Sequence, residues 1–266
     1  NWGDYINPDV LTKFTEETGI AVTLDTYSSN EEMLAKIQAG ATGHDIVFPS
    51  VHMNDIMLKL GLLEKTGINA HPDFKNINPE FLRSKEDPAS EFCLPYAWGT
   101  VGIFYNETVA GPITGYADML AIPAKTGAKI TLLDDMREVL AIGHVMNGTS
   151  VNSVDPAEVQ AAADFVLANK AAVSAVTYEV MPLLSSGDIA AAQFFVGANV
   201  AFTEMPNIKY IIPAEGGTMY QENMCVLASA PNKDNAKKFM EFYLKPEIAA
   251  LNVAQQYNGT PNTPAN

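Results

Sequence analysis

Two hydrophobic patterns alternate along the first sixty residues of this chain. In some stretches apolar residues recur every three to four positions, which is the spacing of one face of an α-helix. In others β-branched and aromatic residues cluster, which is typical of a strand. The pattern predicts helices over residues 7–19, 28–40 and 51–61, and strands over residues 20–27 and 44–50.

The ends of the predicted helices carry residue types that helix termini favour. Asn7 is a candidate N-cap, Pro8 suits the first helical position, and Gly19 suits the C-terminal end. Ser29 and Glu32 have the spacing of a capping box at the start of the second helix. These boundaries therefore rest on side-chain chemistry as well as on hydrophobic spacing.

Short connections join these five elements in the order helix, strand, helix, strand, helix. Such alternation is typical of a parallel sheet with helices packed on its faces. A sheet of this kind begins with a strand, yet nothing precedes the first predicted helix except residues 1–6, NWGDYI. We therefore expect a strand ahead of these six residues, which would place them at its carboxyl end.

A second set of elements follows residues 64–92, which are irregular and rich in Asn, Asp and Pro. Strands are predicted over residues 93–106, 129–135, 171–178, 189–197, 208–217 and 223–229. Helices are predicted over residues 136–148, 155–169, 180–188, 232–246 and 246–256. This arrangement indicates two α/β lobes rather than one sheet.

Charge narrows the class of partner. The chain has 31 acidic residues against 16 basic ones, a formal net charge of −15. This balance argues against nucleic acid as a partner, because phosphates need Lys and Arg. A cationic ligand would suit this charge, since a negative field concentrates cations. The same charge would also be found in an acidic protein that binds no cation. The longest apolar stretch, residues 189–202, is too short to cross a bilayer.

The motifs of common enzymes are absent from the sequence. It contains no G-x-S-x-G, no P-loop and no G-x-G-x-x-G, and its histidines lack the spacing of metal ligands. The stretch LLDDMREV offers Asp134, Asp135 and Glu138. A pair of carboxylates suits acid–base chemistry, but acidic residues are also favoured at the start of any helix. From the residues alone both interpretations stay open.

Cys93 and Cys225 each lie in an apolar, strand-like stretch. We expect two buried free thiols, since unpaired cysteine is among the most buried residue types. A disulfide would be compatible with an oxidising compartment, but two cysteines this far apart do not imply one. No secretory signal is visible in the sequence.

Five stretches of the chain resemble one protein family. In order they are NWGDYINPDVLTKFTEETGIAV, DIVFPS, LPYAWGTVGIFYN, LLDDMREV and IIPAEGGTMYQE. Together they resemble the periplasmic polyamine-binding proteins of bacterial ABC transporters, the spermidine/putrescine-binding family. The first and fourth stretches are fairly specific for this family, whereas DIVFPS is shared more widely among solute-binding proteins. The resemblance runs from end to end of the chain.

The resemblance implies an α/β, two-lobed periplasmic binding protein of the type II solute-binding fold, with a hinge and an interlobe ligand cleft. Lobe one would comprise residues 1–98 and 222–266, and lobe two residues 99–221, with Trp98 packed at the hinge. It further implies a periplasmic monomer that binds a small cationic amine and docks on a membrane permease, without a cofactor, metal or catalytic residue. Because family members extend beyond both ends of this sequence, we expect the chain to lack a first strand and a C-terminal tail.

Polyamines carry ammonium groups separated by methylenes, so a receptor needs carboxylates for the charges and aromatic faces for the methylenes. The resemblance assigns Trp2, Asp4 and Tyr5 in the opening segment to this site. It also assigns Ser50, a small hydroxyl residue, and His52, which stands where the spermidine-binding branch has a tyrosine. A histidine at this position would make binding depend on pH.

In lobe two the resemblance assigns the acidic pair Asp135 and Glu138 to the ligand. They are three residues apart at a helix start, so they can face the same way. Phe195 stands where the family has a stacking tryptophan. Ala198 stands where the putrescine branch has an aspartate, so that contact is expected to be lost.

The last assigned residues are Tyr220 and Glu222, which match an aromatic–x–aspartate pattern, and Tyr257 near the end of the chain. Glu222 is one methylene longer than the aspartate it replaces. Gly3 also departs from the family, which often has a hydroxyl residue there. These departures leave the length of the amine open.

Three other functions compete with polyamine binding. The same fold could bind another amine or an amino acid such as agmatine or GABA; an amino acid would need a basic group for its carboxylate, and Arg137 is the nearest one. An iron-binding protein of this architecture would need adjacent tyrosines, and the sequence has no Tyr-Tyr pair. A hydrolytic enzyme that used Asp135 and Glu138 is a remote third alternative, since no nucleophile motif accompanies them.

Overall fold

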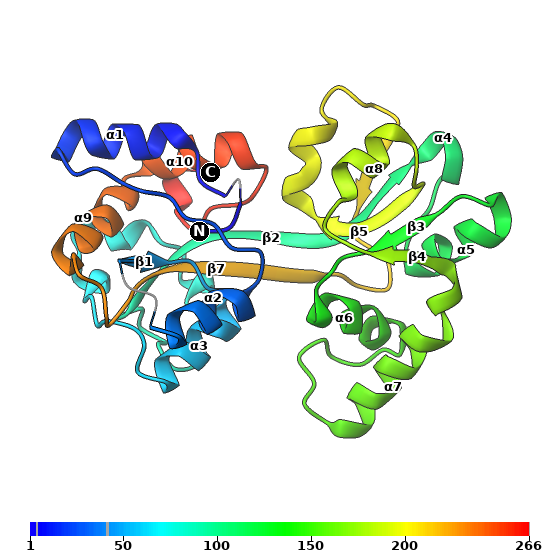
Figure 1. Ribbon diagram of the computed structural model, residues 1–266, viewed down its shortest axis with the longest axis horizontal. Coiled ribbons are helices and arrows are strands. Elements are labelled where there is room, and N and C mark those ends of the chain that lie inside the picture. The colour runs from blue at the N-terminus through cyan, green and yellow to red at the C-terminus, as the bar shows by residue number, and fades with distance from the viewer. Residues whose placement is uncertain (4, 41–42, 266) are drawn as a thin grey trace. The chain divides into compact units, whose positions relative to one another are not determined.

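The computed structural model describes residues 1–3, 5–40 and 43–265 (Figure 1). The chain divides into two compact units: unit 1 holds Asn1–Trp98 and Tyr220–Asn266, and unit 2 holds Gly99–Met219. It passes from one unit to the other within two long strands, β2 (Cys93–Asn106) and β7 (Thr218–Val226). Both units are built from helices and strands, so the predicted α/β class is confirmed.

Unit 1 is built on the strands β1 (Ile46–Val47), β7 and β2, which neighbour one another in this order. Its helices are α1 (Pro8–Thr18), α2 (Asn30–Gln38), α3 (Val51–Lys59), α9 (Lys233–Tyr243) and α10 (Pro246–Gln256). Helices α1 and α10 lie on one face of these strands, and α2 and α3 lie on the other (Figure 1). Helices on both faces leave a buried apolar core around the strands.

The predicted caps of unit 1 are confirmed. The side chain of Asn7 accepts a hydrogen bond from the backbone N–H of Asp9 at the start of α1, and Gly19 ends this helix with φ of 72°. At the start of α2, Ser29 Oγ accepts from the N–H of Glu32 over 3.0 Å. The carboxylate of Glu32 accepts from the backbone N–H and the hydroxyl of Ser28.

Two predictions for the start of the chain are wrong. Residues 20–26 belong to neither helix nor strand, and Tyr27 forms only an isolated parallel bridge with Trp2. A strand is stabilised by hydrogen bonds to a neighbouring strand, and the described residues provide no such neighbour along residues 20–26. The expected parallel sheet is also absent here, since β1 pairs with β7 in antiparallel fashion, with Ile46 opposite Val226.

Unit 2 contains β6 (Ile208–Ile211), the second half of β2, β5 (Ala191–Phe195), β3 (Ile130–Leu132) and β4 (Val173–Val176) in spatial order. β2 pairs antiparallel with β5 and β6, while β3 pairs parallel with β5 and β4. The helices are α4 (Glu107–Ala110), α5 (Tyr116–Thr126), α6 (Met136–Met146), α7 (Pro156–Ala168) and α8 (Val180–Ser186). Parallel pairing, which the sequence predicted for the first sixty residues, is thus found in unit 2 instead.

Helices α6 and α7 lie on the same face of these strands (Figure 1) and pack closely. A Cβ atom on Gly143 would lie 2.1 Å from the backbone oxygen of Ala162, so only glycine permits this approach. Both helices begin with a capping aspartate, Asp135 and Asp155. Helix α5 was not predicted, because Pro123 within it interrupts the helical pattern.

Short 3₁₀ helices fill several connections. They are η1 (Ile68–Ala70), η2 (Pro72–Asn76), η3 (Pro79–Phe81), η4 (Lys170–Ala172), η5 (Val196–Phe202) and η6 (Thr263–Ala265). The first three lie in the stretch 64–92 that the sequence marks as irregular.

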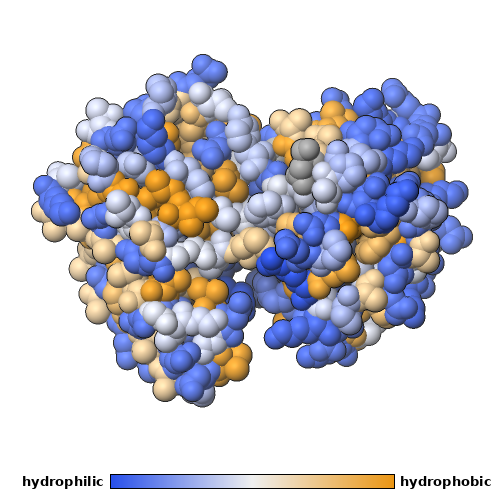
Figure 2. Space-filling model, turned by 180° about the vertical axis from the view of Figure 1, so that it is seen from behind, coloured by the Kyte–Doolittle hydropathy of each residue, from blue (hydrophilic) through white to orange (hydrophobic). Residues whose placement is uncertain are grey.

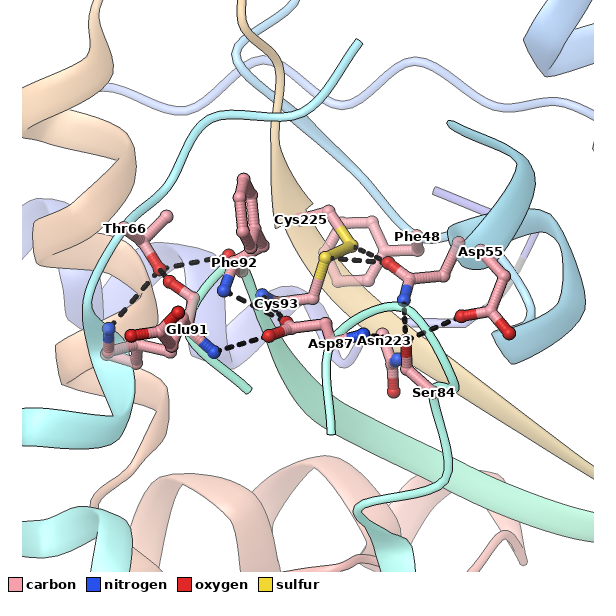
Figure 3. Close-up of a disulfide and its surroundings, with 12 residues drawn as sticks. Phe48, Asp55, Thr66, Ser84, Asp87, Glu91, Phe92, Cys93, Asn223 and Cys225 are labelled. Carbon is pink, nitrogen blue, oxygen red and sulfur yellow. Dashed lines mark hydrogen bonds between the residues drawn. A yellow bond between two sulfur atoms is a disulfide. The ribbon is translucent and has the colours of Figure 1, made fainter. Parts of the chain in front are cut away.

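Cys93 and Cys225 form a disulfide, so the expectation of two free thiols is wrong. The residues lie on neighbouring strands, β2 and β7, with their Cα atoms 4.5 Å apart. Their separation of 132 positions in the sequence hides this proximity. The carboxylate of Asp87 accepts hydrogen bonds from the backbone N–H groups of Glu91, Phe92 and Cys93, which fixes the loop that leads to the disulfide (Figure 3).

The surface has mixed character. In the view of Figure 2, apolar residues gather in several patches between hydrophilic ones. Among the described residues, no helix has the length and the apolar character that a membrane crossing demands.

Candidate functional site

A buried carboxylate, Glu222, lies in the middle of β7 in unit 1. Its side chain is largely enclosed, and only 5% of the residue is exposed. Tyr5 donates its hydroxyl to Oε2 over 2.7 Å, and Ser50 donates to Oε1 over 3.2 Å. Three residues that are far apart in sequence, all of them predicted site residues, thus meet in one cluster. We call Tyr5, Ser50 and Glu222 the Glu222 cluster.

Local structure explains how these side chains meet. Ser50 and Glu222 form an isolated antiparallel bridge where the chain enters α3. Ser50 occupies the N-cap position of α3, but its hydroxyl makes no capping bond and is directed to Glu222 instead. Asn30, the first residue of α2, makes two hydrogen bonds to Ser50. Asn30 Nδ2 donates to Ser50 Oγ over 3.0 Å, and Asn30 Oδ1 accepts from the N–H of Ser50 over 3.1 Å. No motif in the sequence indicates this role of Asn30.

Burial dominates the electrostatics of Glu222. Removal from water raises the pKa of this carboxyl to about 7, against the opposing effect of the hydrogen bonds from Tyr5 and Ser50. No ion pair of the described residues includes Glu222. Buried carboxylates are normally paired with a cation, so this one is suited to receive a cation from outside.

Trp2 lies three residues before Tyr5 of the Glu222 cluster and is partly exposed. Its indole Nε1 donates to the backbone oxygen of Phe48 over 2.8 Å, and its ring meets Tyr27 edge-on at 5.0 Å between centroids. Tyr27 donates to the same oxygen over 2.9 Å. Trp2 is therefore held in a fixed orientation with part of its surface free for contact. Asp4, the other acidic residue predicted in this segment, lies outside the described residues.

The second carboxylate is that of Glu138, a partly buried residue in the first turn of α6 in unit 2. Thr218 donates its hydroxyl to Glu138 Oε2 over 2.5 Å. The backbone oxygen of Glu138 accepts from Nε2 of the fully buried Gln193 over 2.9 Å, which ties this turn to β5. We call Glu138 and Thr218 the Glu138 pair. The sequence did not single out Thr218 or Gln193, since an isolated Thr or Gln carries no motif.

Burial also dominates the electrostatics of Glu138. It raises the pKa of this carboxyl to about 7, the hydrogen bond from Thr218 opposes the shift, and the charge of Asp135 adds to it. Arg137 lowers the pKa of Glu138 slightly, but its side chain is exposed and no ion pair of the described residues joins the two. Glu138 is thus a second carboxylate suited to an external cation.

Asp135, the partner that the sequence assigned to Glu138, is the N-cap of α6. Its Oδ1 accepts the backbone N–H groups of Arg137 over 2.8 Å and Glu138 over 3.1 Å. One oxygen is thus engaged in capping, as either interpretation of LLDDMREV allows. These bonds show that Asp135 caps α6. Contact between Asp135 and the ligand stays a prediction.

Four further residues were predicted for the site, and none of the hydrogen bonds described for the two carboxylates involves them. They are Tyr220, Tyr257, Phe195 and His52. Tyr220 donates its hydroxyl to Asn258 Oδ1 over 2.7 Å, a partner that the sequence did not indicate. Tyr257 follows the end of α10 with φ of 50° and is 51% exposed. Phe195 ends β5 with its ring 5.4 Å from that of Phe194, and His52 lies partly buried in the first turn of α3.

The described residues contain no group of three or more His, Cys, Asp or Glu that could hold a metal ion. The Glu222 cluster offers a buried carboxylate and the Glu138 pair a partly buried one, and each carboxylate accepts from hydroxyl donors. Such groups bind an ammonium by charge-assisted hydrogen bonds.

A family model described as bacterial extracellular solute-binding protein matches residues 9–266. The chain belongs to this family. The resemblance drawn from the five sequence stretches is therefore confirmed, and so is the fold class that it implied.

Relatives of this solute-binding protein carry polyamines in their names. The spermidine/putrescine-binding periplasmic protein of Escherichia coli is 33% identical over 271 residues, which cover 100% of this chain and 77% of the relative. The putrescine-binding periplasmic protein SpuD of Pseudomonas aeruginosa is also 33% identical and covers 97% of this chain, with 77% of the relative matched.

Solved structures agree with these relatives. The spermidine/putrescine ABC transporter substrate-binding protein PotD of Streptococcus pneumoniae superposes with a TM-score of 0.84 at 37% identity, covering 100% of this chain and 82% of that one. The Tp0655 (TpPotD) lipoprotein of Treponema pallidum gives a TM-score of 0.89 at 27% identity, covering 100% and 86%. A GABA receptor gives 0.77 at only 18% identity, which shows a shared fold and nothing of the ligand.

Proposed function

We propose that this solute-binding protein is the substrate-binding component of an ABC importer and captures a small polyamine, of which putrescine is the simplest. It binds without chemical conversion, acts as a monomer in the periplasm, and delivers the amine to a membrane permease. The names of its relatives support the polyamine ligand and the periplasmic location. The name of the Streptococcus pneumoniae protein supports the ABC transporter. Sedimentation of the chain with and without ligand tests the monomer.

The observation that carries the proposal is the pair of carboxylates Glu138 and Glu222. Glu222 is buried and Glu138 is partly buried. Burial raises the pKa of each to about 7, and neither takes part in an ion pair of the described residues. A diamine brings two ammonium groups, and each compensates one buried negative charge. That one ligand bridges both carboxylates remains the prediction made from the sequence.

Other features agree with this ligand. The partly exposed face of Trp2 suits the methylenes between two ammonium groups and attracts cations as well. Among the described residues, the polar groups bonded to the two carboxylates are hydroxyls, not the basic side chain that the carboxylate of an amino acid would need. The Cys93–Cys225 disulfide is typical of proteins in an oxidising compartment such as the periplasm.

Calorimetry with putrescine, cadaverine, spermidine, agmatine and GABA tests the proposal. We expect one amine bound per chain, with putrescine or spermidine the tightest and GABA the weakest, because GABA carries a carboxylate of its own. Binding of GABA alone, or of none of the five compounds, would overturn the proposal.

Matched variants give this experiment its control. Glu138→Gln and Glu222→Gln keep the size of each side chain and remove its charge, and both should weaken amine binding. Glu16→Gln and Glu179→Gln make the same change at exposed positions of units 1 and 2, and both should bind as the unmodified chain does. Equal affinities in all four variants would remove the carboxylates from the site.

A further inference from the structure

The loop between β6 and β7, residues 212–217, is bonded to the start of a helix of unit 2 by its own glutamate, Glu215. Glu215 Oε2 accepts the backbone N–H of Tyr116 over 3.1 Å, and Oε1 accepts that of Ala117 over 3.0 Å. These are two of the N–H groups that the first turn of α5 leaves without a helical partner. The side chain of Glu215 therefore both caps α5 and holds the loop against it.

The start of α5 has room for a carboxylate from elsewhere in the chain. Gly115 occupies the N-cap position and has no side chain with which to cap the helix. A Cβ atom on Gly115 would lie 1.8 Å from Oε2 of Glu215, so any other residue would displace this carboxylate. The φ of Gly115 is −172°, which is extended backbone that all residues can adopt. Glycine at this position therefore provides space for Glu215 and not a special backbone conformation.

Two glycines join Glu215 to Thr218, and both lie against other elements of unit 2. Gly216 has φ of 131°, a value that favours glycine, and a Cβ atom there would lie 3.2 Å from Cγ1 of Val145 in α6. A Cβ atom on Gly217 would lie 3.1 Å from a backbone oxygen of β2. Because this short connection lies against α6 and β2, the position of Glu215 restricts the position of Thr218.

Thr218 is the hydroxyl donor of the Glu138 pair. Its hydroxyl lies 2.5 Å from Glu138 Oε2, and this hydrogen bond favours the charged form of the carboxyl group. A hydroxyl donates effectively only over a narrow range of distances and angles. A displacement of Thr218 by about 1 Å would therefore remove most of this effect.

The start of α5 also lies close to Glu138. Tyr116, the first residue of this helix, is buried, and burial raises its pKa. The negative charge of Glu138 adds to this rise, and the charge of Glu215 contributes further. The helix start that holds the loop thus lies near the carboxylate to which Thr218 donates.

We propose that Glu215 is a positioning residue for amine binding: it holds the loop on α5 and thereby keeps Thr218 within hydrogen-bond distance of Glu138. The inference rests on the proposed function, since Glu138 is one of the two carboxylates assigned to the amine. Glu215 itself is not assigned to the ligand, because both of its carboxylate oxygens are bonded to α5. Its removal should release the loop and weaken the hydrogen bond to Glu138.

Two variants separate positioning from simple helix capping. Glu215→Ala removes both the cap of α5 and the attachment of the loop. Gly115→Ser displaces the carboxylate of Glu215, but the serine hydroxyl can cap α5 in its place, so the helix should keep its stability. We expect both variants to weaken putrescine binding about 3- to 10-fold at pH 7, and only Glu215→Ala to lower Tm. If Glu215→Ala does not fold, Gly115→Ser provides the test.

Asp155→Ala is the matched control. Asp155 accepts the N–H groups of Ala157 and Glu158 at the start of α7, so this change removes a cap of the same kind without altering the loop. Tm should fall, but calorimetry should give the putrescine affinity of the unmodified chain. In Thr218→Val the hydroxyl is already absent, so the further change Glu215→Ala should alter affinity less than about twofold.

A titration without ligand measures the same effect. The NMR signal of the side-chain carboxyl carbon of Glu138, assigned with Glu138→Gln, gives the pKa of this group in the ligand-free protein. Loss of the bond from Thr218 should raise this pKa, so both positioning variants should raise it as Thr218→Val does. Asp135 and Arg137, the charged groups that also act on Glu138, are the same in all these variants.

Three outcomes would overturn the positioning role and leave Glu215 as a helix cap only. They are an unchanged pKa of Glu138 in both variants, an equal loss of affinity in Asp155→Ala, and an undiminished effect of Glu215→Ala when Thr218 is already valine. Absence of putrescine binding to the unmodified chain would overturn the proposed function instead. The titration would still show whether Glu215 acts on Glu138, so the failures of the two proposals are distinguishable.

Discussion

Glu222 in unit 1 and Glu138 in unit 2 are glutamates whose pKa burial raises to about 7, yet the protein holds them in different ways. Glu222 accepts two hydroxyl groups, from Tyr5 and Ser50, which come from the start of the chain and from the entry to α3. Glu138 accepts one, from Thr218, and lies in the first turn of a helix beside a second carboxylate.

The two carboxyl groups thus differ in the groups that stabilise their negative charge. In the Glu222 cluster, two hydrogen bonds from residues far apart in the sequence favour the charged form of the carboxyl group. Burial opposes them and favours the neutral form. The Glu138 pair relies on one hydrogen bond and a helix N-terminus, where the macrodipole favours negative charge, against repulsion from Asp135. We therefore expect the two sites to respond differently when single groups are removed.

The largest expected effect comes from removing either charge. Glu222→Gln and Glu138→Gln should each weaken putrescine binding by about 100-fold or more, because an ammonium is then buried without its counter-charge. Calorimetry measures the change. In the double variant, the single binding event should be weaker than in either single variant. Two separate binding events, each abolished by only one of the two changes, would contradict the predicted bridging.

A change of pH should have the next largest effect. A carboxyl whose pKa is raised from 4.5 to about 7 in the folded state favours folding below pH 4.5, and this contribution is lost as the pH rises through 7. Tm of the ligand-free protein should therefore fall between pH 5 and 8.

Putrescine affinity should change in the opposite sense, rising roughly 10- to 100-fold from pH 6 to 8, since the carboxylates ionise while the amine stays charged. Calorimetry in two buffers with different ionisation enthalpies should detect proton release on binding. Affinity that is flat with pH would place both carboxyl groups in the charged form before the ligand arrives.

Removal of single hydroxyl donors should have smaller and unequal effects. Tyr5→Phe and Thr218→Val each delete one hydrogen bond to a carboxylate, which raises its pKa further and should weaken binding about 5- to 10-fold at pH 7. Glu222 keeps Ser50 after the first change, whereas Glu138 keeps no hydroxyl donor among those described after the second, so Thr218→Val should cost more. The loss should shrink at pH 9; a pH-independent loss would indicate misplacement of the carboxylate instead.

The smallest effect is expected from Asp135→Asn. Asparagine caps a helix as well as aspartate does, so α6 should keep its start and Tm should stay within a few degrees. If Asp135 serves mainly as the cap, putrescine affinity should change less than about threefold. A loss of tenfold or more with unchanged Tm would assign the free oxygen of Asp135 to the ligand, and Asp135→Ala would then lower both affinity and Tm.

The sequence predicts the local features of this fold well and the non-local ones poorly. The caps Asn7, Gly19 and Ser29 follow from the chemistry of neighbouring residues, so they could be read directly. The disulfide could not, because it depends on β2 and β7 coming together across a sequence separation of 132 positions. Segment 20–27 has strand composition but no strand, since pairing depends on a neighbour that composition cannot supply.

The candidate site shows the same division. Tyr5, Ser50 and Glu222 were named through family resemblance, and the structure brings Tyr5 and Ser50 within hydrogen-bond distance of Glu222. Asn30 and Thr218, which orient or bond these acids, carried no signal, because an Asn at a helix start and a Thr at a strand start are common everywhere. Groups that act through another side chain are visible only once the fold is known.

The disulfide between Cys93 and Cys225 has a topological consequence. The bond closes a covalent ring, and every residue of unit 2, from Gly99 to Met219, lies on that ring. A single protease cut in unit 2 would therefore leave one molecule of unchanged mass apart from the added water, and two fragments would separate only after reduction. Unit 1 supplies both ends of the ring, so a nick in its partner unit does not release either terminal segment from the other.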